Sequence, residues 1–109
     1  MAQETLHDIL GPGDRAITIE MIQKTIADHF KMRIQELKSK NNSKSVTLPR
    51  QICMYLCKRL TGASLPQIGR EFGDKHHTTV LHSVNKIQQM IQEDRDIAKQ
   101  VQMFMDSFK

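Results

Sequence analysis

The chain has 109 residues and a mass of 12.6 kDa, which suits one small domain, because domains commonly run to about 100–150 residues. Hydrophobic residues make up 39% and charged residues 26%, a composition that excludes a disordered chain, and no apolar run approaches the roughly 20 residues that cross a bilayer. The formal net charge is +4, and two Cys without an N-terminal secretory signal indicate a reducing compartment rather than a disulfide scaffold.

The first part of the chain predicts a lead-in followed by a helix. Residues 1–17 contain Gly11-Pro12-Gly13, a turn or linker signal. Thr18 is a good N-cap, and a predicted helix over 19–30 follows. Its apolar stripe consists of Ile19, Ile22, Ile26 and Phe30. A further short helical turn is predicted around 34–37.

The middle of the chain predicts an exposed loop and a long helix. Residues 38–45 are polar, basic and aperiodic, as in a loop. Leu48-Pro49 is predicted to open the helix, because Pro is tolerated in a first turn, and Thr61-Gly62 ends it. The buried face would be Ile52, Leu56 and Leu60, with Arg50, Lys58 and Arg59 on the polar side.

Three more helices are predicted in the last third. Ser64 and Gln67 form a capping-box pattern for a short helix that Gly73 ends. A longer helix is predicted over 77–92, and Asp94 can cap a last one. Their stripes are Val80, Val84, Ile87 and Ile91, then Ile97, Val101, Phe104 and Phe108. With no alternating strand pattern, the predicted fold class is all-α, with five or six helices.

The charge is unevenly distributed along the chain. Residues 31–75 hold ten basic and three acidic residues, a net +7, whereas the rest of the chain is at −3. A positive middle between acidic ends favours a polyanionic partner, of which phosphate backbone is the commonest. A solvated charged surface is one alternative that charge alone leaves open, and an anionic membrane surface is another.

The segment 64–80 has the pattern of a helix-turn-helix. That motif needs a small residue where its two helices cross, a glycine at the turn and an apolar residue early in the second helix. Gly69, Gly73 and Val80 fill those positions. A helical hairpin without a DNA role could show the same pattern.

Polar residues then crowd the start of the second helix, the part of the motif that enters the major groove. Lys75 can meet guanine or phosphate, and the two His can donate or accept. Thr can offer a methyl group to thymine and a hydroxyl to a base edge. The candidate readers are Lys75, His76, His77, Thr78 and Thr79.

These segments resemble the C-terminal DNA-binding domain of the bacterial replication initiator family DnaA. The resemblance rests on PRQ at 49–51, SLPQIGREFG at 64–73 and HTTVLH at 77–82, and it extends over about 18–108. It implies a helical bundle with a helix-turn-helix, similar to the Trp repressor. It also implies recognition of asymmetric DnaA boxes, near TTATCCACA, in double-stranded DNA at replication origins and in some promoters.

The resemblance implies a role for particular residues. His77 and Thr78 would read bases, and Thr79 would contact the backbone or a thymine. A basic loop, here with Lys40, Asn42 and Lys44, would enter the minor groove. Phosphate contacts would come from Arg50, Gln51, Lys58, Ser64 and His82, and first-helix contacts from Leu65 and Pro66.

Two departures from the family pattern affect specificity. Relatives usually have Arg-Asp where this chain has Lys75-His76. An Asp can accept a hydrogen bond from cytosine N4, whereas His offers a different donor pattern. Asn42 stands where relatives have the minor-groove cation, for which Lys40 or Lys44 could substitute.

The family's ATPase resides in a separate upstream domain, and this chain has no Gly-rich phosphate-binding loop ending in Lys and Ser or Thr. We therefore expect no enzyme activity and no cofactor, with ATP confined to that other domain. Residues 1–17 resemble its end, and 18–109 would form the connector helix and the DNA-binding domain. An excised domain and a naturally short protein would look the same.

Other functions are weighed against this one. Cys53 and Cys57 share a helix face, but no second ligand pair has zinc-finger spacing, so buried thiols are preferred to a metal. A protein-interaction domain with a basic face for an acidic regulator is the main alternative, and regulatory proteins could also mask a DNA-binding face. We expect a monomer in the cytoplasm, associated with the nucleoid.

Overall fold

The computed structural model describes residues 17–108, so the predicted lead-in of residues 1–16 lies outside the described residues. Helices and no strands make up the regular structure of that described range, which confirms the all-α fold class. The helices are α1 (Ile19–His29), α2 (Ile34–Leu37), α3 (Lys44–Thr61), α4 (Leu65–Glu71), α5 (His77–Glu93) and α6 (Arg95–Ser107).

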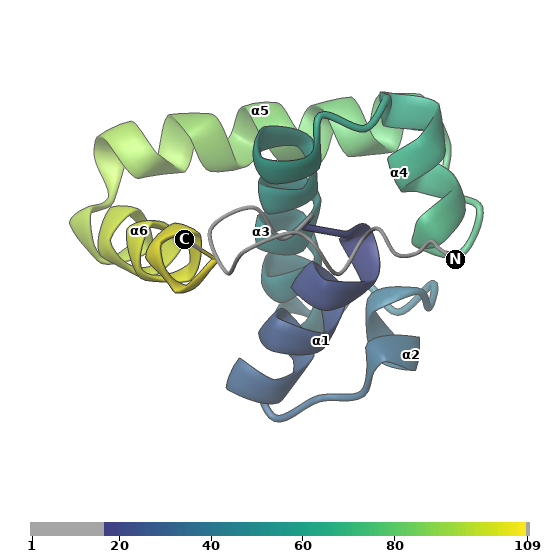
Figure 1. Ribbon diagram of the computed structural model, residues 1–109, viewed down its shortest axis with the longest axis horizontal. Coiled ribbons are helices and arrows are strands. Elements are labelled where there is room, and N and C mark those ends of the chain that lie inside the picture. Colours follow the sequence, from purple (N-terminus) through teal and green to yellow (C-terminus); the bar gives the residue numbers. More distant parts are fainter. Residues whose placement is uncertain (1–16, 109) are drawn as a thin grey trace, which may run out of the picture.

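The helices are arranged around α3, which runs through the middle of the molecule (Figure 1). Helix α5 crosses α3, and α4 packs against α5 near its start. Helix α6 folds back beside the far end of α5, while α1 and α2 lie against α3 below this layer (Figure 1). The arrangement leaves α4 and the start of α5 together at one end of the molecule.

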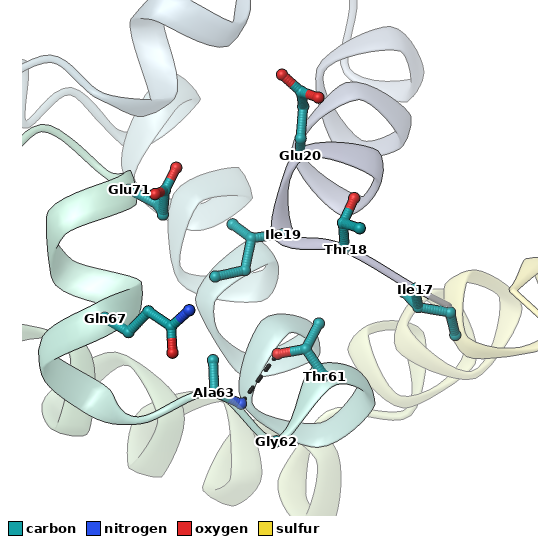
Figure 2. A pocket seen from close by; sticks show the side chains of 9 residues that line it. All are labelled: Ile17, Thr18, Ile19, Glu20, Thr61, Gly62, Ala63, Gln67 and Glu71. Carbon is teal, nitrogen blue, oxygen red and sulfur yellow. Dashed lines mark hydrogen bonds between the residues drawn. The ribbon is translucent and has the colours of Figure 1, made fainter. Parts of the chain in front are cut away.

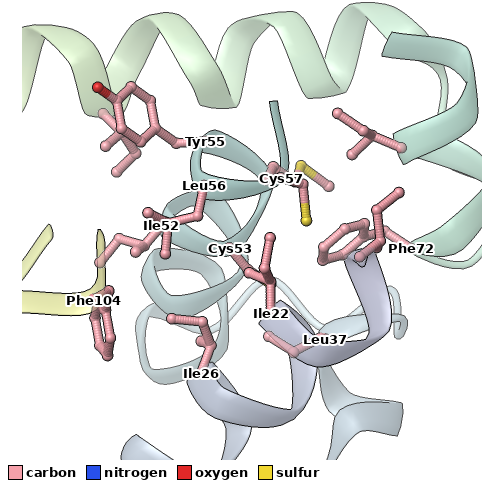
Figure 3. Packing of buried hydrophobic residues seen from close by; sticks show 14 of the residues in the cluster. Ile22, Ile26, Leu37, Ile52, Cys53, Tyr55, Leu56, Cys57, Phe72 and Phe104 are labelled. Carbon is pink, nitrogen blue, oxygen red and sulfur yellow. The ribbon is translucent and has the colours of Figure 1, made fainter. Parts of the chain in front are cut away.

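The predicted apolar stripes meet in one hydrophobic core (Figure 3). The core is largely aliphatic, as the composition indicates, and Phe72 is the largest of its fully buried side chains. Positions at the ends of the stripes, including Phe30, Leu60 and Phe108, are only partly buried at its edge. Fully buried stripe residues come from α1, α3 and α5 and are Ile22, Ile26, Ile52, Leu56, Val80 and Ile87.

The predicted N-caps are confirmed. The Thr18 hydroxyl accepts from the Met21 amide at 3.1 Å, and the Ser64 hydroxyl accepts from the Gln67 amide at 3.2 Å. The Asp94 carboxylate accepts from the second and third amides of α6 at 2.9 and 3.3 Å. These bonds satisfy amides that the helices cannot satisfy internally, so the caps define where three of the helices begin.

The start of α3 differs from the prediction. The helix begins at Lys44 rather than at 48, and Pro49 therefore lies inside it rather than in its first turn. Val46, which is only 4% exposed, attaches the extra turn to the protein. Pro49 lacks an amide for the hydrogen bonds of the helix, and the polar composition of residues 38–45 concealed the extra turn.

Candidate nucleic-acid interface

The crossing of α4 and α5 has the close contact that the helix-turn-helix pattern predicts. The Lys75 amide donates to the Gly69 carbonyl at 2.9 Å. A Cβ atom on Gly69 would collide with the carbonyl oxygen of Lys75 and would lie 3.6 Å from Val80 Cγ2. Gly69 is therefore needed for its lack of a side chain, and Val80 is the apolar residue at the crossing.

The turn between the two helices packs against the end of α2. Gly73 has φ +81° and Asp74 has φ +57°, so the chain reverses through left-handed backbone. A Cβ atom on Gly73 would collide with the Lys38 carbonyl. The turn is therefore fixed beside the basic segment that follows α2.

Helix α5 begins with a histidine cap. His76 Nδ1 accepts from the Thr78 amide at 3.2 Å and lies 2.8 Å from the Thr78 hydroxyl. The rings of His76 and His77 stack with centroids 4.4 Å apart. His76, His77, Thr78 and Thr79 are all exposed, so this end of α5 presents polar groups to solvent.

Lys75 is directed inward, unlike its exposed neighbours. Its Nζ donates to the carbonyls of Ser39 and Phe72, both at 2.8 Å, and of Lys38 at 3.3 Å. Burial lowers the pKa of Lys75, and the positive charges of Arg50 and Lys40 lower it further. Each of its three N–H groups has a carbonyl acceptor, so Lys75 links the turn to the loop.

Arg50 was predicted on the polar side of its helix, and that prediction is wrong. Its side chain is 5% exposed. The guanidinium donates to the carbonyls of Asn41 at 2.8 Å, Ser39 at 3.0 Å and Leu37 at 3.1 Å, with a longer bond to Glu36 at 3.4 Å. Arg50 thus holds the backbone of the basic loop against α3.

The basic loop is shaped by these two cations and by its own side chains. The Asn41 side-chain oxygen accepts from the Ser43 amide at 2.8 Å, and Ser39 Oγ accepts from the Asn41 amide at 3.2 Å. Lys40, Asn42 and Lys44 are exposed. The loop therefore has a held backbone and free side chains, and the bonds of Lys75 place it beside the turn.

A second group of predicted residues lies at the corner between α3 and α4. The Lys58 ammonium donates to the Ala63 carbonyl at 3.3 Å and is exposed. The Ser64 hydroxyl is used by its cap, while Pro66 is exposed and Leu65 partly buried. The end of α3 and the start of α4 both face solvent at this corner, where they present the Lys58 ammonium and the amide end of α4.

The remaining predicted residues lie further along α3 and α5. Gln51 is partly buried and lines a cavity of about 220 Å³ between these helices, whereas His82 is exposed. The sequence reasoning missed Leu81, which is 43% exposed and stands one helical turn after Thr78. The inward stripe of 80, 84 and 87 already places position 81 outside, and that spacing could have revealed it.

A larger cavity, of about 610 Å³, lies between α1, α4 and the end of α3 and adjoins the corner between α3 and α4 at Ala63. Figure 2 shows Glu20 of α1 and Glu71 of α4 at one end of it. The Ala63 amide donates to the Thr61 hydroxyl at 3.0 Å in its wall (Figure 2). Two carboxylates make this cavity unsuitable for a polyanion.

The two cysteines, the candidate metal ligands and the lengths of the helices bear on other functions. Cys53 and Cys57 are free and buried, and both belong to the hydrophobic core (Figure 3). In residues 17–108, no three His, Cys, Asp or Glu side chains are placed to hold a metal ion. None of the helices described is long and apolar enough to cross a membrane.

A short capped helix, a glycine turn and a second helix with a polar exposed start define a helix-turn-helix domain. Residues 19–87 match the family described as bacterial dnaA protein helix-turn-helix. The chain belongs to this family, and its helix-turn-helix is the DNA-binding, non-catalytic type of domain found in DnaA.

Relatives named chromosomal replication initiator protein DnaA are similar to this chain. Those of Citrifermentans bemidjiense and Geobacter metallireducens are 47% and 44% identical over 102 residues, 94% of this chain. That of Gluconobacter oxydans is 42% identical over 101 residues, 93% of this chain. The chain spans only 22%, 23% and 21% of these relatives' lengths, respectively.

Proposed function

We propose that this chain binds double-stranded DNA sequence-specifically at DnaA boxes of a bacterial replication origin, as the DNA-binding part of a replication initiator. The observation that supports this most directly is the bond from Lys75 Nζ to the Ser39 carbonyl at 2.8 Å. Through it the start of α5 and the basic loop form one unit. A single rigid unit can present one element to the major groove and the other to the adjacent minor groove.

The proposed contacts with DNA are assigned to side chains that are exposed on α5 and on the basic loop. His77, Thr78 and Leu81 read base edges, since they stand exposed on the first turns of α5. Thr79 contacts the backbone or a thymine. Lys40, Asn42 and Lys44 enter the minor groove from the loop.

Phosphates are held from the flanks, which fixes the register of the protein on the duplex. Lys58, Gln51, Ser64 and His82 supply these contacts, and Leu65 and Pro66 approach the DNA at the start of α4. Arg50 acts indirectly, because its guanidinium is occupied by the carbonyls of the loop. It is a positioning residue rather than a phosphate ligand.

A complete initiator protein would add further activities to the DNA binding of this chain. ATP binding belongs to a separate upstream domain, and the DNA-binding chain itself uses neither cofactor nor metal and acts as a monomer. The same sites in promoters would let the protein regulate transcription, and regulatory proteins can mask the basic face. Its place of work is the cytoplasm, on the nucleoid.

Fluorescence anisotropy tests the proposal. The chain is titrated with a duplex carrying TTATCCACA and with a scrambled duplex of equal composition, at two salt concentrations. We expect preference for the box and affinity that falls with salt. Equal, strongly salt-dependent binding to both duplexes would contradict sequence-specific recognition. Absence of binding to either would favour the protein-docking alternative.

The same assay tests the phosphate contacts. Lys58→Ala should weaken binding to both duplexes alike and reduce the slope of log affinity against log salt by about one unit. Lys24→Ala, an exposed cation of α1, is the matched control and should leave the slope unchanged. An unchanged slope in Lys58→Ala would show that Lys58 does not contact the phosphates.

A further inference from the structure

The cap at the start of α5 fixes the tautomer of His76. The Thr78 backbone N–H can only donate, and it donates to His76 Nδ1 at 3.2 Å. Nδ1 must therefore offer its lone pair, so the proton of the neutral ring is on Nε2. The exposed end of the ring is consequently a hydrogen-bond donor.

The lone pair on His76 Nδ1 also sets the direction of the Thr78 hydroxyl hydrogen. Its hydroxyl lies 2.8 Å from His76 Nδ1. Since Nδ1 is already an acceptor, the hydroxyl must direct its hydrogen toward the ring. The outward side of the Thr78 oxygen then offers only lone pairs, and the two residues together present one donor and one acceptor.

The ring of His76 is also held in orientation. Its stacking on His77, with an interplanar angle of 30°, adds a second constraint to the cap. No described residue accepts a hydrogen bond from Nε2, and the side chain is exposed. The free N–H is thus presented in a fixed direction at the end of α5 that a helix-turn-helix directs toward the major groove.

We propose that His76 is a specificity-determining residue whose Nε2–H selects a base with an acceptor edge, guanine before thymine. Guanine shows N7 and O6, both acceptors, in the major groove, thymine shows one acceptor, O4, and adenine shows the N7 acceptor beside its N6 amino donor. Cytosine shows only the N4 amino donor there, so a donor facing it has no acceptor to meet. An acidic side chain at position 76 would have the opposite preference.

Two cap-preserving variants separate base selection from capping. Asn and Asp both cap helices well, so His76→Asn and His76→Asp should both fold, as circular dichroism would confirm. An Asn that caps through its oxygen still presents an N–H donor, whereas Asp presents acceptors only. If His76 acted only as a cap, both variants would keep the base preferences of the natural chain.

The experiment measures relative affinities of the natural chain and both variants for every single base-pair substitution of the box. We expect the natural chain and His76→Asn to favour guanine over cytosine at one position by about tenfold, and His76→Asp to invert that ratio. Ratios are compared within each protein, because the added charge of Asp lowers its affinity for all duplexes.

The inference rests on the proposed DNA binding, and the outcomes distinguish the two. If the natural chain does not discriminate the box from scrambled DNA, the proposed function fails and the inference with it. Box preference with the same profile in all three proteins overturns the inference alone. Long-range ¹⁵N–¹H spectra give a second readout, in which a proton on His76 Nδ1 at neutral pH would also overturn it.

Discussion

Arg50 shows how a single buried side chain can organise a polar loop through the carbonyls of its backbone. Three well-formed bonds join its guanidinium to the carbonyls of residues 37, 39 and 41. A loop of polar residues has no apolar contacts to fix it, so its conformation depends on such bonds. Burial lowers the pKa of Arg50, but the intrinsic basicity of a guanidinium keeps it charged.

Replacing Arg50 should therefore cost stability. Arg50→Met retains much of the aliphatic stem but leaves the Leu37 and Asn41 carbonyls without the donors that Arg50 provides, and we expect a loss of about 3 kcal/mol in the free energy of unfolding. Urea denaturation followed by circular dichroism measures it. Arg59→Met, an exposed arginine of the same helix, should stay within about 0.5 kcal/mol. Equal effects of the two changes would contradict the structural role of Arg50.

We predict that Thr78 serves base reading rather than general affinity for DNA. Thr78→Ala removes the methyl group and the hydroxyl acceptor while leaving the backbone amide that His76 caps. We expect discrimination between cognate and scrambled duplexes to fall by about 1–3 kcal/mol, with binding to the scrambled duplex nearly unchanged. Anisotropy titrations of both duplexes measure this difference. Equal losses on both would place Thr78 on the phosphate backbone instead.

At the scale of the elements, the angle between α4 and α5 is fixed by backbone contact. Gly69 lies against the Lys75 carbonyl, and Gly73 lies against the Lys38 carbonyl. The first contact sets the helix-turn-helix crossing, and the second joins the turn to the loop. The start of α5 and the basic loop, the two elements proposed to contact DNA, therefore depend on two positions without side chains.

Gly69→Ala tests this crossing. Ala is ordinarily better than Gly inside a helix, so any destabilisation must come from the collision with Lys75, and we expect about 3 kcal/mol by urea denaturation. Gly62→Ala is the control, because Gly62 has φ +71° but open space around it, and strain alone costs about 1 kcal/mol. A Gly69 variant as stable as the natural chain would show that the helices can separate freely.

The sequence predicted the elements better than the interface. Each helix has its own local signals, such as Thr18 before a stripe of Ile, and these need no knowledge of the fold. Lys75 and Arg50 were placed at the surface because long cations are seldom buried. Their partners are carbonyls brought near by packing, which no residue pattern encodes. The His76 cap was missed for another reason, since histidine is not among the preferred N-cap residues.

At the scale of the molecule, the six helices of residues 17–108 all contribute to one core. Such a core should unfold in a single cooperative transition. Cys53 and Cys57, both with no exposed surface, lie within it and can report on that transition. Burial, aided by a hydrogen bond with Cys57, raises the pKa of the Cys53 thiol well above its ordinary value. The thiolate is the reactive form of cysteine. The folded protein therefore protects the Cys53 thiol in two ways, because it excludes the reagent and keeps the thiol protonated.

Thiol labelling therefore measures global opening. With a chromogenic disulfide reagent at neutral pH, we expect no rapid reaction in the native protein and two thiols per chain in denaturant. Slow native labelling should be one phase for both thiols, and Gly69→Ala should accelerate it about a hundredfold if it loses about 3 kcal/mol.

A duplex that binds only the folded chain should slow thiol labelling in proportion to the duplex concentration divided by its Kd. Box DNA must then protect more than scrambled DNA. One thiol reacting rapidly without denaturant would contradict the single core, and equal protection by both duplexes would contradict specific binding.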